Sequence, residues 1–199
     1  MNFYKQLSKR IFDVFIVILL LPIWVPVLGL LSLFILASMG RPVFFIQQRP
    51  GFHGKIFALL KLRTMNLGSE SDSKRLTRVG AFLRSTSLDE LPSLWNILKG
   101  DMSLVGQRPL LVQYLQCYTK EQMLRHNVKP GLTGLVQVNG RNLLSWDEKF
   151  DLDLEYVQKI SFRLDLLILL KTLSRVLLRH GISAQNSVTM PEFTGQSGC

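Results

Sequence analysis

The chain has 199 residues, 47% of them hydrophobic, and a formal net charge of +10 at pH 7. This length fits one domain, and the apolar content excludes a disordered basic tail, which would lack the residues to build a core. The charge predicts an anionic partner, either nucleic acid, acidic lipid headgroups or a phosphorylated substrate. Cys117 and Cys199 lie far apart without metal-ligand spacing, so we expect free thiols.

The first predicted element is a membrane helix. No charged residue occurs between Val14 and Gly40, and this run exceeds the roughly 20 residues that a helix needs to cross a bilayer. A cleaved signal peptide fits poorly, because the run is too long and no small-residue cleavage site closes it. Pro22 and Pro26 are expected to kink the helix, and positive residues flank both ends, which favours the cytoplasmic side for both. A re-entrant helix over residues 1–40 and a spanning helix both remain open on these grounds.

Next comes a predicted hairpin, with strands over residues 43–48 and 55–62 and a turn-rich loop between them. The period of two residues places Lys61 and Arg63 on one face. We then expect a polar loop over residues 66–74.

Short helices are predicted over residues 76–83 and 87–99, the second ended by Gly100. Further on, we expect a bend at 107–109, a helix over 111–126 and a loop over 129–142.

The last predicted helix covers residues 162–180. It carries Lys171, Arg175 and Arg179 at intervals of four residues, opposite a leucine-rich face. The helix is too charged to span a membrane, and the pattern is typical of a helix in the membrane interface. Packing of this helix on the domain's own core is the alternative.

Asp89 and Glu90 are the candidate catalytic residues. Pro92 is tolerated only near a helix start, which places both carboxylates in the first turn. An acidic side chain there stays ionised and is available as a nucleophile or metal ligand. The alternative is a capping box, because Ser87 and Glu90 have the spacing at which Glu90 simply satisfies a backbone donor.

Several basic residues stand singly among Pro, Gly and apolar residues. Scattered cations of this kind converge on an anion more often than a run of charge does. They are Lys61, Arg63, Arg84, Arg108 and Arg141. Arg84 also lies beside the predicted helix start, where phosphate binds well.

Eight short motifs follow one another along nearly the whole chain. They are KRIFD at residues 9–13, QRPG at 48–51, KLRTM at 61–65, TSLDELP at 86–92, LKGDMS at 98–103, RPL at 108–110, KPGLTG at 129–134 and QVNGRN at 137–142. In sequence and order they resemble the small monotopic phosphoglycosyl transferases of the bacterial sugar transferase family.

The resemblance implies a reaction. In that family the aspartate of an Asp-Glu pair attacks the β-phosphate of a UDP-sugar with Mg²⁺ bound, UMP leaves, and polyprenol (undecaprenyl) phosphate accepts the phospho-sugar. Asp89 would be the nucleophile and metal ligand, and Glu90 would position the metal or assist proton transfer. Substrate or phosphate binding is implied for Lys61, Arg84, Arg108 and Arg141. Asp153 matches a family acidic position to which we assign no role.

The resemblance also implies a fold and a location. We expect a predominantly helical α+β protein, with a re-entrant helix over residues 1–40, a small hairpin and interfacial helices. A catalytic domain over residues 41–199 would form one unit with that helix and face the cytoplasm at the bacterial inner membrane. This chain has Val25 before Pro26 where the family often has serine at the helix break, and Gln107 replaces a proline beside Arg108.

Three other classes of protein fit less well. A nucleic-acid-binding protein would interleave aromatic and basic residues, which this chain does not do. A membrane adaptor would need no Asp-Glu pair beside scattered cations, and a polytopic transferase would need many apolar spans. The partners that the resemblance implies are a UDP-sugar, polyprenol phosphate and membrane lipid. Nucleic acid is not expected as a partner, and no residue discriminates the sugar.

Overall fold

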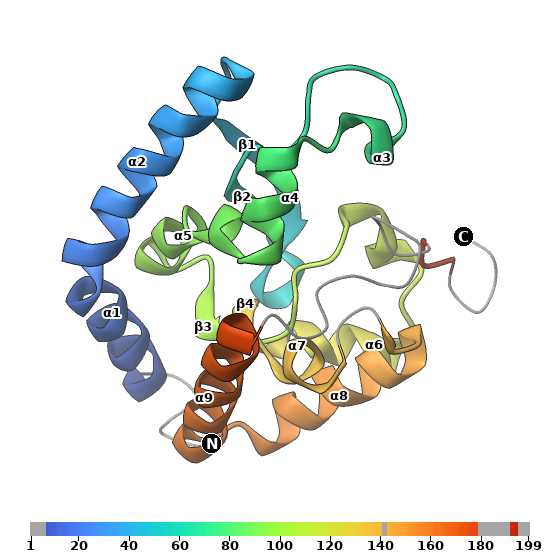
Figure 1. The fold of residues 1–199 in the computed structure, drawn as a ribbon. Coiled ribbons are helices and arrows are strands. Elements are labelled where there is room, and N and C mark those ends of the chain that lie inside the picture. The colour runs from blue at the N-terminus through green and yellow to red at the C-terminus, as the bar shows by residue number, and fades with distance from the viewer. Residues whose placement is uncertain (1–6, 141–142, 179–191, 195–199) are drawn as a thin grey trace.

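The computed structural model describes residues 7–140, 143–178 and 192–194. These residues form a mostly helical protein, as predicted. They contain two small two-stranded sheets, of which the first is the predicted hairpin and the second was not predicted. The apolar N-terminal segment forms α1 (Lys9–Leu19) and α2 (Leu21–Met39), which meet at Leu20. Figure 1 shows α1 and α2 along one side of the molecule, with a bend where they join.

Pro22 explains where the N-terminal helix is interrupted. Pro22 lies in the first turn of α2 and lacks an N–H, so the backbone hydrogen bonds cannot run on unbroken from α1. The indole of Trp24 donates to the carbonyl of Val17 at 3.1 Å, which satisfies an acceptor at the break. The predicted interruption is therefore present at Pro22, whereas α2 continues through Pro26.

The second of these helices is exposed along most of its length. Among the described helices, α2 alone is long and apolar enough to cross a membrane. A core helix or a signal sequence passes the same test of length and composition. A core helix would be mostly buried, but 11% of the apolar window of α2 is buried within the protein.

The predicted hairpin is confirmed. Strands β1 (Phe44–Pro50) and β2 (Ile56–Leu62) pair antiparallel, from Phe44 opposite Leu62 to Pro50 opposite Ile56. The 3-10 turn η2 (Phe52–Gly54) joins them, and Gly54 adopts the positive φ of 74° that a tight turn demands.

Short helices follow the hairpin. They are α3 (Asp72–Arg75) within the predicted polar loop, α4 (Arg78–Ser85), the 3-10 turn η3 (Leu88–Glu90) and α5 (Ser93–Lys99). The helix predicted over 76–83 appears as α4, which begins after Thr77 because this side chain accepts from the Gly80 N–H. The single helix predicted over 87–99 is wrong, since the chain forms η3 and then α5. Gly100 ends α5 as predicted, with a φ of 96°.

A second sheet lies at the centre of the molecule. Strands β3 (Ser103–Val105) and β4 (Gly131–Thr133) pair in parallel. The chains approach closely here, because a Cβ on Gly131 would lie 2.1 Å from the backbone nitrogen of Gly106. The expectation of a loop over 129–142 is therefore wrong, since this segment contains β4 and α7 (Leu135–Asn139).

The helix predicted over residues 111–126 is also wrong. This segment forms the 3-10 turn η4 (Val112–Gln116), α6 (Lys120–Met123) and the 3-10 turn η5 (Leu124–Asn127). A capping box at Thr119 and Gln122 starts α6, so the chain turns there rather than continuing one helix.

Two longer helices follow. The helix α8 (Trp146–Lys159) was not predicted and begins at a capping box between Ser145 and Glu148. The predicted C-terminal helix is present as α9 (Phe162–Leu178), while Arg179 and His180 lie outside the described residues.

The largest apolar cluster packs the first described helix, α1, together with the last, α9. Buried side chains from α1, α5, β3, α8 and α9 form it, and they include Val17, Ile97, Val105, Tyr156 and Ile168. Two buried polar contacts reinforce this packing. Ser103 donates to Asp13 at 2.7 Å, and Lys9 forms an ion pair with Asp165 at 2.5 Å.

Candidate active site

The acidic pair lies in the tight turn between α4 and α5. Asp89 and Glu90 belong to η3, and Pro92 caps α5. Ser87 has a left-handed backbone with a φ of 58° and makes no side-chain capping bond. The capping-box alternative for Glu90 is therefore not realised.

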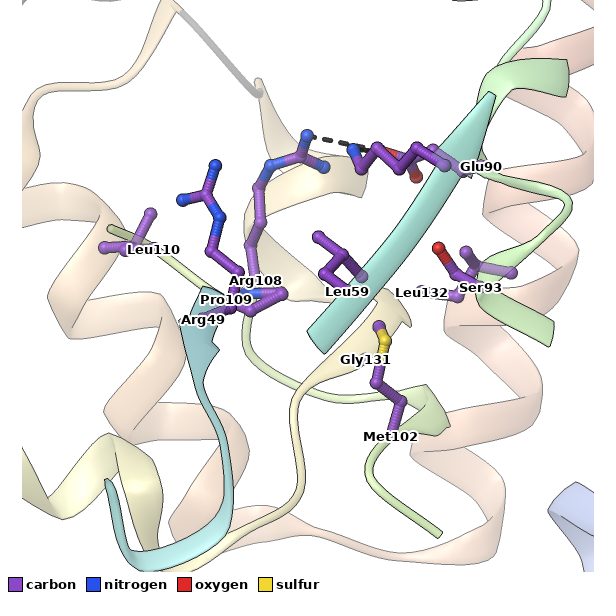
Figure 2. Close-up of a pocket in the computed structure, with 11 residues that line it drawn as sticks. Arg49, Leu59, Glu90, Ser93, Met102, Arg108, Pro109, Leu110, Gly131 and Leu132 are labelled. Atoms are coloured by element: carbon purple, nitrogen blue, oxygen red, sulfur yellow. Dashed lines mark hydrogen bonds and ion pairs between the residues drawn. The ribbon is translucent and has the colours of Figure 1, made fainter. Parts of the chain in front are cut away.

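Glu90 is held by two of the predicted cations. Lys61 Nζ donates to Glu90 Oε1 at 2.7 Å, and Arg108 Nη2 donates to the same oxygen at 3.3 Å. Lys61 lies on β2, and Arg108 lies in the bend after β3. Figure 2 shows the Arg108 guanidinium directed toward Glu90 across the pocket.

Side chains of α5 fix the position of β2 beside this turn. Asn96 accepts from the Leu60 N–H at 3.1 Å and donates to the Ala58 carbonyl at 2.8 Å. Ser93 donates to the Leu60 carbonyl at 2.8 Å. Because Lys61 is the next residue, these bonds set its distance from the acidic pair.

Asp89 is buried, with 9% of its surface exposed. Burial, followed by the neighbouring charge of Glu90, raises the pKa of the Asp89 carboxyl to about 6. The positive charges of Lys61, Arg108 and Arg84 act in the opposite direction and lower this pKa. The carboxylate is thus mostly ionised at neutral pH, yet poorly solvated, which is a property of functional sites.

The carboxylates of Asp89 and Glu90 are also the oxygen ligands that Mg²⁺ prefers. Mg²⁺ commonly takes one or two carboxylates and completes its shell with water and substrate phosphates. In the described part of the chain no cluster of three or more His, Cys, Asp or Glu residues could hold a metal ion, so water or substrate oxygens would complete the shell. The residues present fit a substrate-shared Mg²⁺.

Arg84 approaches the pair from the last turn of α4. Its Nε donates to Thr64 Oγ1 at 3.0 Å, and its charge lowers the pKa of Asp89. The structure thus places Lys61, Arg84 and Arg108 around the two carboxylates. Their roles in substrate binding stay predictions.

Arg63 has different partners from the other cations. It is 5% exposed, and its Nη2 donates to the carbonyls of Met39 and Gly40 at 2.6 and 2.7 Å. A cation is favoured at these last carbonyls of α2 by the helix dipole. The guanidinium therefore stabilises the end of α2, and the placement of Arg63 with Lys61 in the substrate site is not supported. Arg141 lies outside the described residues.

A small pocket lies beside the acidic pair. Its lining includes Lys61, Glu90, Arg108 and also Arg49. Burial and then the charge of Arg108 lower the pKa of Arg49 to about 10. In Figure 2 the guanidinium groups of Arg49 and Arg108 point to the same side of the pocket. Sequence reasoning missed Arg49 as a site residue, although it belongs to the QRPG motif.

The structure gives Asp153 a partner. It is 3% exposed and accepts two bonds from Arg125, from Nε at 3.0 Å and from Nη2 at 2.6 Å. Arg125 Nη2 also donates to the carbonyl of Arg108 at 2.9 Å. Asp153 is therefore linked to the site through the backbone of Arg108.

Comparison with known proteins gives several similarities. The sequence model described as bacterial sugar transferase matches residues 4–179. The uncharacterized sugar transferase EpsL of Bacillus subtilis is 50% identical, over 96% of this chain and 97% of that protein. The undecaprenyl-phosphate galactose phosphotransferase of Salmonella typhimurium is 39% identical, over 89% of this chain and 42% of that protein.

A further relative has a name that states both substrates. The UDP-glucose:undecaprenyl-phosphate glucose-1-phosphate transferase of Klebsiella pneumoniae is 38% identical, over 86% of this chain and 40% of that protein. The chain thus spans nearly all of the Bacillus protein and about two fifths of the Salmonella and Klebsiella proteins.

Proposed function

This chain belongs to the bacterial sugar transferase family, and from this premise we propose that it transfers a sugar 1-phosphate from a UDP-sugar to undecaprenyl phosphate. The names of the Salmonella and Klebsiella relatives support this reaction class. The observation that carries the proposal is the turn holding Asp89 and Glu90, on which Lys61, Arg84 and Arg108 act. An acidic pair surrounded by cations suits attack on a phosphorus atom whose leaving group is an anion.

The transfer proceeds in two steps. An oxygen of Asp89 forms a bond to the β-phosphorus of the UDP-sugar, and the bond from this phosphorus to the bridging oxygen breaks, so that UMP leaves with the electron pair. A phosphate oxygen of undecaprenyl phosphate then attacks the phosphorus of the aspartyl phospho-sugar. This second displacement frees the Asp89 carboxylate and yields the lipid diphosphate-linked sugar.

The residues around Asp89 have separate tasks. Burial keeps the Asp89 carboxylate poorly solvated, while its pKa of about 6 leaves it ionised at neutral pH. Lys61, Arg84 and Arg108 offset the charge of the diphosphate and of the departing UMP. Glu90, oriented by Lys61 and Arg108, assists metal positioning or proton transfer at the acceptor.

Asp89 would hold Mg²⁺, and Glu90 would help to position it. When bound, it would neutralise charge on the diphosphate and make the phosphorus more electrophilic. The carboxylates of Asp89 and Glu90 would supply hard oxygen ligands for this ion.

Release of UMP tests the reaction. The purified protein is incubated in detergent with Mg²⁺, undecaprenyl phosphate and each member of a panel of UDP-sugars. We expect repeated UMP release with at least one donor, loss of that release after chelation of Mg²⁺, and no more than one equivalent of UMP per protein without the lipid acceptor. Release of UDP, or no release with any donor, would contradict the proposed reaction.

Membrane attachment through a re-entrant N-terminal helix is part of the same proposal. The exposed apolar surface of α2 supports it, as does the interruption beside Pro22. A second apolar surface lies on α9, where Leu166, Leu170 and Leu173 are exposed, although Ile168 packs into the core. We infer that α1 enters and α2 leaves on the cytoplasmic face, and that the exposed leucines of α9 contact the membrane interface.

Cysteine labelling distinguishes a re-entrant from a spanning helix. In a background with Cys117→Ser and Cys199→Ser, single cysteines replace Leu7 and Lys55, which lie before α1 and after β1. We expect a membrane-impermeant maleimide to label both positions in inside-out vesicles and neither in right-side-out vesicles. Labelling of the two positions from opposite faces would establish a spanning helix.

A further inference from the structure

Arg49 and Arg108 are two like charges held close together. Both line the pocket beside Glu90, and their guanidinium groups point to the same side of it (Figure 2). Two causes lower the pKa of the Arg49 guanidinium. The larger is burial, and the second is the positive charge of Arg108. Arg49 Nε is buried without a hydrogen-bond partner. Such an arrangement is unfavourable unless other groups fix it or an anion joins the two cations.

The bend that carries Arg108 is fixed by Arg125. This residue lies in η5, is 1% exposed and donates to the Arg108 carbonyl at 2.9 Å. The ion pair with Asp153 at 2.6 Å orients its guanidinium. The centres of the Tyr118 and Phe150 rings lie 5.8 and 5.7 Å from its Cζ, and Nη1 donates to the Tyr118 hydroxyl at 3.3 Å.

The end of β1, which carries Arg49, is fixed by the residue after Arg125, His126. Its Nδ1 lies 3.1 Å from the carbonyl of Gly51, two residues beyond Arg49. Burial and then the charge of Arg125 lower the pKa of His126 to about 4, so the ring is neutral at pH 7. Because a carbonyl can only accept, Nδ1 holds the ring proton.

Two consecutive side chains thus bind the two backbone segments from which the pocket arginines extend. We propose that Arg125 and His126 are positioning residues that set the spacing of the Arg108 and Arg49 guanidinium groups for the diphosphate of the nucleotide donor. The inference rests on the proposed function, because that reaction requires a nucleoside diphosphate group in this pocket. Neither residue touches the reacting atoms.

Binding of UDP with Mg²⁺ present, measured by calorimetry, tests the contribution of Arg125. The double variant Arg125→Met/Asp153→Asn removes the bond to Arg108 without leaving a buried charge unpaired. We expect it to bind UDP about tenfold more weakly, the effect of losing roughly one charge-assisted contact. The matched control is Lys9→Met/Asp165→Asn, which removes another buried ion pair. Both variants should lower the melting temperature, but only the first should weaken UDP binding.

Substitution of His126 independently tests the contact at the end of β1. His126→Leu removes the bond to Gly51 and should weaken UDP binding severalfold, whereas His126→Asn keeps an N–H donor near the Nδ1 position and should restore most of the affinity. In turnover assays, loss should fall mainly on KM for the UDP-sugar rather than on kcat.

The outcomes separate this inference from the proposed function. If the wild-type protein binds no UDP, the positioning role is overturned, and if it also releases no UMP from any UDP-sugar, the proposed function is overturned as well. If the wild type binds UDP and releases UMP, but the Arg125→Met/Asp153→Asn and His126→Leu variants bind UDP as tightly, the positioning role alone is wrong. Equal weakening in the Lys9→Met/Asp165→Asn control would also overturn it, because the effect would then follow from stability alone.

Discussion

Replacing Asp89 by asparagine is expected to abolish UMP release, with a loss of more than about a thousandfold in rate. The amide keeps the shape of the side chain but cannot attack phosphorus, and loss of a nucleophile has effects of this size or larger. The fold should persist, because the ionised form of this buried carboxylate is disfavoured by burial and by Glu90. The measurement is UMP release under saturating UDP-sugar and Mg²⁺, with the melting temperature recorded in parallel.

Two controls accompany this variant. Asp89→Ala excludes recovery of activity by deamidation of the asparagine. In the wild type, the first turnover should slow as the pH falls through about 6, because the raised pKa of Asp89 leaves less of the nucleophile ionised. Normal activity in Asp89→Asn would instead show that Asp89 is not the nucleophile and that the acidic pair has a structural role.

Removal of the Arg84 side chain is expected to produce the second largest loss. Its guanidinium charge acts on Asp89, where the diphosphate of the donor is proposed to bind. Arg84→Ala should cost about 3 kcal/mol of transition-state stabilisation, or on the order of a hundredfold in rate. The rate is measured in detergent micelles with saturating Mg²⁺ and UDP-sugar.

Arg175, on α9, provides the matched control for a surface cation. Arg175→Ala should leave the rate in detergent unchanged and weaken binding to anionic vesicles by about 1 kcal/mol. Equal loss of rate in both variants, or an unaltered rate in Arg84→Ala, would contradict the assignment of Arg84 to an active site around Asp89.

Sequence patterns predicted the parts of this fold that repeat over several residues or carry strong local signals. The hairpin follows from its turn-rich loop, the end of α5 from Gly100, and the interruption between α1 and α2 from Pro22. The three-residue strands β3 and β4 could not be predicted, because so short a segment has no visible period and depends on close backbone approach at Gly106 and Gly131.

Side-chain partners far apart in the sequence were the hardest part of the site to predict. Lys61 and Arg108 stand singly among uncharged residues in the sequence, which allowed them to be grouped with the acidic pair. In the structure both side chains donate hydrogen bonds to Glu90. Arg63 follows the end of β2, and its side chain bonds the carbonyls of Met39 and Gly40, 24 and 23 residues away in the sequence, which the strand pattern does not reveal. The role of Asp153 required its contact with Arg125, which lies 28 residues away in the sequence.

Mass spectrometry after addition of donor without acceptor tests the central claim most directly. Trypsin cleaves after Arg84 and Lys99, so residues 85–99 form one peptide that contains both Asp89 and Glu90. We predict that this peptide gains the mass of a phospho-sugar, that fragmentation places it on Asp89, and that undecaprenyl phosphate removes it. An active protein whose peptide carries no adduct under these conditions, or carries it on Glu90, would contradict the proposed mechanism.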